Sequence, residues 1–198
     1  MRHALSYALL AVAVLALSVT VTAAGEAYGS QQLVRLANGR PGLMVTVNGQ
    51  GPFPFLVDTG TSHTVLVPKL RAQLGIPASP GPRYQVVTAA GRIESSFHTI
   101  SEMAASGVVV EGVHAIVIDL PKSIGVMGIV GADFLSNFTV DLELGRQKIT
   151  LYPAGTIIDP PGFVKLKGTL NSADFIVLPA RVENVAASAV FDSGAIWS

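Results

Sequence analysis

Two short stretches of this sequence place an aspartate, a small hydroxyl residue and a glycine directly after apolar residues. The first reads F-L-V-D-T-G-T-S over residues 55–62, and the second reads V-F-D-S-G-A over residues 190–195. A carboxylate that follows a buried strand is costly unless hydrogen-bond donors or a partner compensate for its burial. The hydroxyl residue can donate to the carboxylate, and the glycine allows a tight turn that brings backbone N–H groups close. Each stretch therefore predicts a turn that presents a carboxylate.

The repetition of this turn changes its interpretation. A single Asp-Thr-Gly indicates an ordinary Asx-type turn, but Asp192 repeats Asp58 134 positions later. If the two turns pack about a pseudo-twofold axis, their carboxylates meet. Like charges about 3 Å apart cannot both ionise, so such a pair holds one proton and titrates as a unit. One carboxylate then activates a water molecule and the protonated one polarises a carbonyl group, which is hydrolytic chemistry.

The residues before each aspartate predict two strands joined by a tight turn. Residues 43–58 contain two apolar stretches around N-G-Q-G, a strong hairpin signal that leads the chain to Asp58. Residues 175–192 resemble this unit, and Val47 corresponds to Val182 if the second turn is one residue shorter. The sequence therefore predicts an internal repeat whose second copy is cut off.

Most of the remaining pattern is that of short strands, and the only helices expected after the N-terminus are 68–74 and 132–137. Residues 108–110 and 113–118 are almost continuously apolar, which predicts strands buried on both faces. The fold class is mainly β, with many short strands closing on themselves as a barrel. The other expected strands are 65–67, 84–88, 92–97, 142–144 and 147–151.

Composition excludes several classes of function. The 13 basic and 13 acidic residues balance, and no run of Lys or Arg offers the clustered positive charge of a nucleic-acid surface. The absence of cysteine excludes disulfides, thiol catalysis and Cys-based zinc sites. The four histidines have no metal-ligand spacing. With water as the nucleophile, the predicted chemistry requires neither a metal nor an organic cofactor.

The N-terminus has the pattern of a signal peptide over residues 1–24: a short basic start, an apolar stretch and a small-residue exit near Ala23 or Ala24. The alternative is an uncleaved membrane anchor, since the apolar stretch is close to the minimum spanning length of roughly 17 residues. Either interpretation predicts an exported protein, periplasmic or secreted.

Three motifs make this chain resemble the retropepsin-like and pepsin-like aspartic peptidases, in their bacterial exported form. They are the stretch F-L-V-D-T-G-T-S at 55–62, T-A-A-G-R-I at 88–93, which is similar to the flap hairpin of that family, and G-I-V-G-A-D-F-L-S-N-F-T-V-D-L at 128–142, which is similar to its apolar–apolar–Gly turn followed by a short helix and strand. The resemblance implies a closed β-barrel of the acid-protease type, with one complete lobe and the start of a second. The flap tip lacks the aromatic residue of pepsin-like members.

The resemblance also implies a role for each matching residue. Asp58 and Asp192 are the implied catalytic pair. Thr59 and Ser193 brace the pair across the two lobes, and Gly194 belongs to the same support. Gly60 is implied to donate its N–H to the Asp58 carboxylate, and Thr61 to orient the outer oxygen of that carboxylate. The residues implied to pack beneath the Asp58 turn are Ile129, Val130 and Gly131. The residues implied to form the flap tip over a bound peptide are Ala89, Ala90 and Gly91.

These observations predict an aspartic endopeptidase that hydrolyses peptide bonds in peptides or proteins. Its expected organisation is a signal peptide at 1–24, a first lobe at 30–153, a linker at 154–168 and a truncated second lobe at 169–198. The dyad partner comes either from the second lobe of the same chain or from a second Asp58 in a homodimer. The alternatives are a catalytically silent peptide-binding module of the same fold and a membrane-tethered structural β-domain.

Overall fold

The computed structural model describes residues 25–37, 39–77, 81–88 and 91–195. The predicted signal peptide therefore lies outside the described residues. In chain order the elements are β1 (Gly29–Gln32), β2 (Val34–Arg35), β3 (Pro41–Val47), β4 (Gln50–Val57), β5 (Val65–Leu66), α1 (Pro68–Gln73), β6 (Tyr84–Thr88), β7 (Gly91–Ser95), β8 (Phe97–Ala105), β9 (Val108–Val117), η1 (Lys122–Ile124), β10 (Gly128–Val130), α2 (Ala132–Leu135), β11 (Phe138–Glu143), η2 (Leu144–Arg146), β12 (Lys148–Pro153), β13 (Thr169–Leu170), β14 (Ile176–Val182) and β15 (Val185–Val190).

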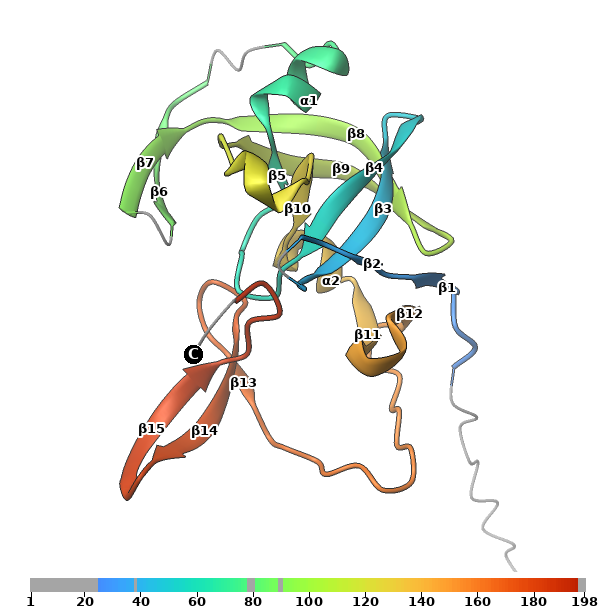
Figure 1. Cartoon of the computed structure of the whole chain (residues 1–198), viewed down its shortest axis with the longest axis vertical. Coiled ribbons are helices and arrows are strands. Elements are labelled where there is room, and N and C mark those ends of the chain that lie inside the picture. Colours follow the sequence, from blue (N-terminus) through green and yellow to red (C-terminus); the bar gives the residue numbers. More distant parts are fainter. Residues whose placement is uncertain (1–24, 38, 78–80, 89–90, 196–198) are drawn as a thin grey trace, which may run out of the picture.

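Six strands close into a barrel, which confirms the predicted fold class. Their order is β3-β4-β10-β5-β9-β8, and β8 pairs back with β3. β10 lies parallel to β4 and antiparallel to β5, while β5 lies parallel to β9. Closure removes the free strand edges that an open sheet of this size would expose. Figure 1 shows the barrel in the upper part of the molecule.

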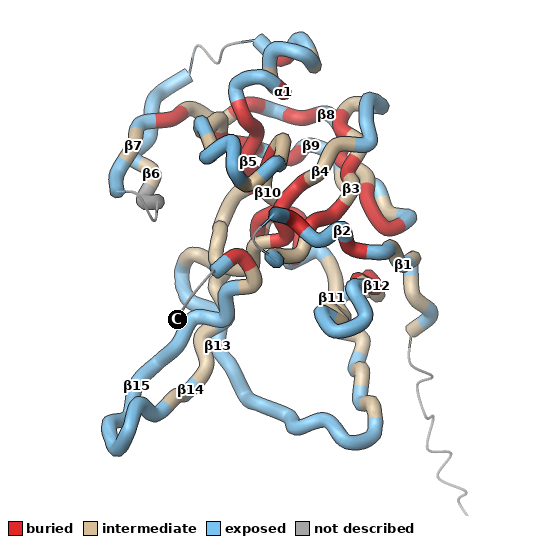
Figure 2. The backbone as a smooth tube through the Cα atoms, viewed as in Figure 1, coloured by how far each residue is buried: buried red, intermediate tan, exposed pale blue. Residues whose placement is uncertain are grey.

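The core of the barrel follows from period-2 alternation along its strands. In β3 the side chains of Leu43, Val45 and Val47 point inward and are fully buried, as expected for a strand with one face on the core. The largest fully buried side chains of this core are Phe55 from β4 and Phe134 from α2. Figure 2 shows buried residues concentrated in these strands.

The prediction of two fully buried strands at 108–110 and 113–118 is wrong. These residues form one ten-residue strand, β9, which pairs with β8 along most of its length. In its first half Val108 and Val110 are half-buried against the core, whereas Val109 between them is 58% exposed, and full burial begins only at Val113. A run of apolar residues does not reveal which part of a long strand reaches the core.

A second, smaller unit follows the barrel. Residues 154–168 form no helix or strand and lead to the three-stranded sheet β13-β14-β15. Figure 1 shows this connection as a long outer loop, with the small sheet below the barrel. Every residue of β15 is exposed, and Val182, Val185 and Val190 are among the exposed large apolar side chains.

The two hairpins that lead to the aspartates differ by one residue, but not where the sequence predicts. Each has a two-residue turn, because Val47 pairs with Gln50 and Val182 with Val185. The extra residue of the first hairpin lies in β4, where the register shifts between Val45 and Val47. A bulge accommodates one additional residue in a strand without changing the turn.

One buried hydroxyl in the β8–β9 turn predicts a stabilising substitution. Ser106 is 4% exposed, and its Oγ has no hydrogen-bond partner among the described residues. A buried polar atom left unpaired costs about 1–3 kcal/mol. We expect Ser106→Ala to raise the free energy of unfolding by about 1 kcal/mol in urea titration, whereas the exposed Ser101→Ala leaves it unchanged. An equal or lower stability of Ser106→Ala contradicts this expectation.

Among the residues that the structure describes, no helix combines the length and apolar character needed to cross a membrane.

Candidate active site

The first Asp turn begins where β4 leaves the barrel. The Asp58 N–H donates to the Val130 carbonyl at 3.1 Å, which ties the turn to β10. Its carboxylate accepts the Gly60 N–H at Oδ1 (2.9 Å) and the Thr61 hydroxyl at Oδ2 (2.8 Å). Both oxygens therefore have donors from the turn itself, as a half-buried carboxylate requires.

The second Asp turn follows β15 and repeats part of this geometry. The Gly194 N–H donates to Asp192 Oδ1 at 2.8 Å, as Gly60 does for Asp58. Ala195 occupies the position that corresponds to Thr61, so this turn supplies no hydroxyl to the outer carboxylate oxygen. The two turns thus have the same backbone contact but different side-chain support.

Thr59 and Ser193 interlock the two turns through four hydrogen bonds. The Thr59 N–H donates to Ser193 Oγ (3.2 Å), and the Ser193 N–H donates to Thr59 Oγ1 (3.0 Å). Each hydroxyl then donates to the carbonyl before the opposite aspartate, Thr59 to Phe191 (2.8 Å) and Ser193 to Val57 (2.9 Å). These four bonds form two matching pairs, which is the pattern of a pseudo-twofold interface.

Close approach of the two turns depends on their glycines. A Cβ atom built on Gly60 would lie 2.6 Å from Cγ of Asp192, and one built on Gly194 would lie 2.4 Å from Cγ of Asp58. Each aspartate therefore packs against the glycine of the opposite turn. Only a residue without a side chain leaves room for the two carboxyl groups to come together.

The environment of Asp58 favours its protonated form. Burial is the largest cause that raises the pKa of Asp58, and the neighbouring Asp192 raises it further by charge repulsion and by a side-chain hydrogen bond. The Thr61 hydroxyl and the Gly60 N–H act in the opposite direction, because they stabilise the carboxylate. The net effect is a pKa above the ordinary value for aspartate.

β10 and α2 support the Asp58 turn from beneath. The Ala132 N–H donates to the Thr61 carbonyl at 2.8 Å. A Cβ atom on Gly131 would lie 2.7 Å from the backbone of His63, so this position also requires a close backbone approach. The stretch that includes Val130 thus lies where the resemblance implies.

Asp133, in the first turn of α2, joins this helix to the segment that follows the Asp58 turn. The N-cap of α2 is Gly131, which makes no side-chain cap. The Asp133 carboxylate instead accepts the N–H (2.8 Å) and hydroxyl (2.9 Å) of Thr64, as well as the Phe134 N–H (2.9 Å). Burial is the main cause that raises the pKa of Asp133. Its carboxylate therefore anchors the segment after the Asp58 turn to α2.

The predicted flap hairpin exists as strands β6 and β7, which pair from Tyr84↔Ser95 to Thr88↔Gly91. Ala89 and Ala90 lie outside the described residues, while Gly91 has φ +117° at the start of β7. Figure 1 shows this hairpin extending from the barrel next to β8.

An aromatic row that the sequence did not reveal links this hairpin to the Asp58 turn. His63 packs on Phe97 with ring centroids 4.9 Å apart, and Phe97 packs on Tyr84 at 5.3 Å. His63 thus contacts an aromatic ring at the start of β8. Tyr84 and Phe97 give no periodic signal that would identify this contact in advance.

The described residues contain no group of three His, Asp or Glu side chains placed to hold a metal ion.

Comparison with known proteins matches residues 43–134 to the family described as "Aspartyl protease". Among solved structures, the chain is similar to a retropepsin-like aspartic protease from Rickettsia conorii, with 20% identity, a TM-score of 0.48, and coverage of 64% of this chain and 94% of that one. It is also similar to EIAV protease complexed with the inhibitor HBY-793, with 25% identity, a TM-score of 0.38, and coverage of 48% and 85%. No curated protein matches.

The family match spans the Asp58 turn, the β6–β7 hairpin and the β10–α2 segment, and it ends before Asp192. The first two motifs behind the resemblance lie within this segment, and the third, at 128–142, begins within it and continues beyond its end. The part of the chain that matches the aspartyl protease family is thus residues 43–134, which include the first Asp turn.

Proposed function

We propose that this protein is an aspartic endopeptidase in which Asp58 and Asp192 form the catalytic dyad. The observation that carries the proposal is the interlock of Thr59 with Ser193, which brings two Asp-hydroxyl-Gly turns together from positions 134 residues apart. An ordinary Asx turn is stable without a second Asp turn packed against its glycine, as Asp192 packs here against Gly60. The match of residues 43–134 to the aspartyl protease family supports the same chemistry.

The proposed mechanism uses water as the nucleophile. The dyad holds one proton, and its ionised carboxylate takes a proton from water as the water oxygen attacks the scissile carbonyl carbon. The protonated carboxyl group donates to the carbonyl oxygen and stabilises the tetrahedral intermediate. Transfer of a proton to the amide nitrogen then breaks the C–N bond and releases an acid and an amine. The raised pKa of Asp58 supports a shared proton, whose titration belongs to the pair.

The same interlock supports a dyad formed within one chain. Two contacts support this: Ser193, next to Asp192, bonds to Thr59, and Asp192 itself packs against Gly60, whereas in a homodimer a second chain would supply the partner of Asp58. We further propose the lobe organisation 30–153, 154–168 and 169–198, with export directed by residues 1–24. The mass of the mature protein tests export, because signal cleavage removes about 23 residues.

The substrate is proposed to bind as an extended peptide beneath the β6–β7 hairpin, with Ala89, Ala90 and Gly91 at the flap tip. An extended peptide pairs with a hairpin through backbone hydrogen bonds, which requires no charged recognition site.

A peptide library digested in water enriched in oxygen-18 tests this function. The expected result is cleavage at internal bonds, with one heavy oxygen in each new carboxylate and activity that falls as pH rises above the raised pKa of Asp58. The exposed Glu111→Gln variant is a matched carboxylate control and should cleave like the wild type.

The alternative function is a catalytically silent peptide-binding module of the same fold. Such a module would bind library peptides in equilibrium dialysis, and no cleavage products with new termini would form. Binding without cleavage across the acidic and neutral range therefore contradicts the peptidase proposal and favours this module.

A further inference from the structure

The contact that carries the inference joins the β2–β3 turn to the second Asp turn. Nη1 of Arg40 donates to the Gly194 carbonyl at 3.0 Å, across 154 residues of sequence. This charged donor and the interlock of Thr59 with Ser193 hold the second turn against the barrel. Charge-assisted hydrogen bonds are stronger than neutral ones.

Gly194 is held at both ends of its backbone. Its carbonyl accepts from Arg40, and its N–H donates to Asp192 Oδ1 at 2.8 Å. The two groups belong to neighbouring peptide units joined at the Gly194 Cα, so the bond to Arg40 restricts the positions of the N–H that orients the Asp192 carboxylate. Arg40 acts on the aspartate through one intervening residue.

The need for this contact follows from the difference between the two turns. Thr61 donates to Oδ2 of Asp58, but Ala195 stands in the corresponding place after Asp192. The second turn thus has one fewer side-chain support for its carboxylate. It also follows β15, whose residues are all exposed, rather than a buried barrel strand such as β4.

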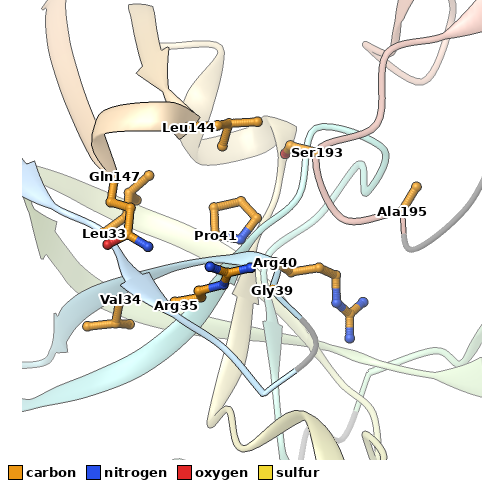
Figure 3. Close-up of a pocket in the computed structure, with 10 residues that line it drawn as sticks. All are labelled: Leu33, Val34, Arg35, Gly39, Arg40, Pro41, Leu144, Gln147, Ser193 and Ala195. Carbon is orange, nitrogen blue, oxygen red and sulfur yellow. The ribbon is translucent and has the colours of Figure 1, made fainter.

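Arg40 itself has a well-defined backbone position. The Leu36 N–H donates to the Arg40 carbonyl at 3.1 Å, and the Gly39 N–H donates to the Leu36 carbonyl at 2.8 Å. These bonds close the turn that carries Arg40. Figure 3 shows its side chain pointing toward the side of Ala195, next to a cavity of about 230 Å³ that Arg35 and Ser193 also line. Neither aspartate lines this cavity.

We propose that Arg40 is a positioning residue of the dyad, which fixes Asp192 through the Gly194 peptide. The inference rests on the proposed function, and it predicts a change in kcat rather than in KM because Arg40 acts on the dyad through Gly194. Misplacement of a reacting group by about 1 Å can cost about 10²-fold in rate. We expect Arg40→Met to lower kcat by about 10- to 100-fold with KM unchanged.

The test compares Arg40→Met and Arg40→Lys with wild type in peptide cleavage and in amide hydrogen exchange. Lysine can donate a single hydrogen bond to a carbonyl, so Arg40→Lys should recover part of kcat. Exchange should become faster at residues 191–195 in Arg40→Met and stay unchanged in β8 and β9. Arg35→Met, which alters the same cavity, is the matched control and should behave as wild type in both measurements.

The outcomes separate the inference from the function on which it rests. A wild-type kcat in Arg40→Met, a raised KM with unchanged kcat, or unchanged exchange at 191–195 overturns the role of Arg40. If the wild type itself cleaves no peptide, the proposed function fails. Exchange alone then decides the contact, and unchanged exchange at 191–195 overturns it in that case as well.

Discussion

Replacement of Asp58 by asparagine should lower kcat by about 10²- to 10⁴-fold, the usual contribution of a positioned acid–base group. The amide can still accept one hydrogen bond from Gly60 or Thr61, so the turn keeps its shape. It has no ionised form that takes a proton from water. Cleavage of a library-derived peptide measures the loss, and Asp192→Asn should give a loss of similar size, because the two carboxyl groups act as a unit.

A stability measurement accompanies this prediction and separates chemistry from folding. Burial and the nearby Asp192 raise the pKa of Asp58, so its ionised form destabilises the folded state above that pKa. Asp58→Asn removes this cost at neutral pH, and we expect its free energy of unfolding to exceed that of wild type. The difference should shrink as pH falls through the raised pKa, where wild-type Asp58 becomes protonated. An inactive variant that is also less stable at neutral pH would indicate damage to the fold instead.

Addition of one methyl group at Gly194 should impair activity about 100-fold through geometry alone. The new Cβ would lie 2.4 Å from Cγ of Asp58, a separation that no real contact of this kind tolerates. The two turns must then move apart, which lengthens the Thr59–Ser193 hydrogen bonds and separates the carboxyl groups. Gly60→Ala should act in the same way, because its Cβ would lie 2.6 Å from Cγ of Asp192.

Gly145 provides the matched control for these glycine variants. A Cβ atom at Gly145 meets nothing within 4 Å, and its φ is not in the left-handed region. Gly145→Ala should therefore retain wild-type kcat and stability in peptide cleavage and urea titration. Full activity of Gly194→Ala would contradict the close packing of each aspartate on the opposite glycine.

Much of the fold was readable from local patterns. The hairpin before Asp58, the β6–β7 hairpin and the two short helices follow from turn residues and apolar periodicity, which act over a few positions. Strand β8 and the three-residue β10 were not identified as strands, because their pairing depends on neighbours far away in sequence. The bulge in β4 was missed for the same reason, since only its partner strand defines the register.

By itself, the sequence determined which groups are present for chemistry. It contains two Asp-hydroxyl-Gly turns, each after a strand pair, and it has no cysteine and no clustered charge. Their spacing could not show that Thr59 and Ser193 interlock or that each aspartate packs on the opposite glycine. Nor did any local signal mark Arg40, whose partner lies 154 residues away. Turn conformation depends on neighbouring residues, so short sequence patterns predict it. The meeting of two distant turns depends on closure of the barrel and docking of a second hairpin, which only tertiary structure decides.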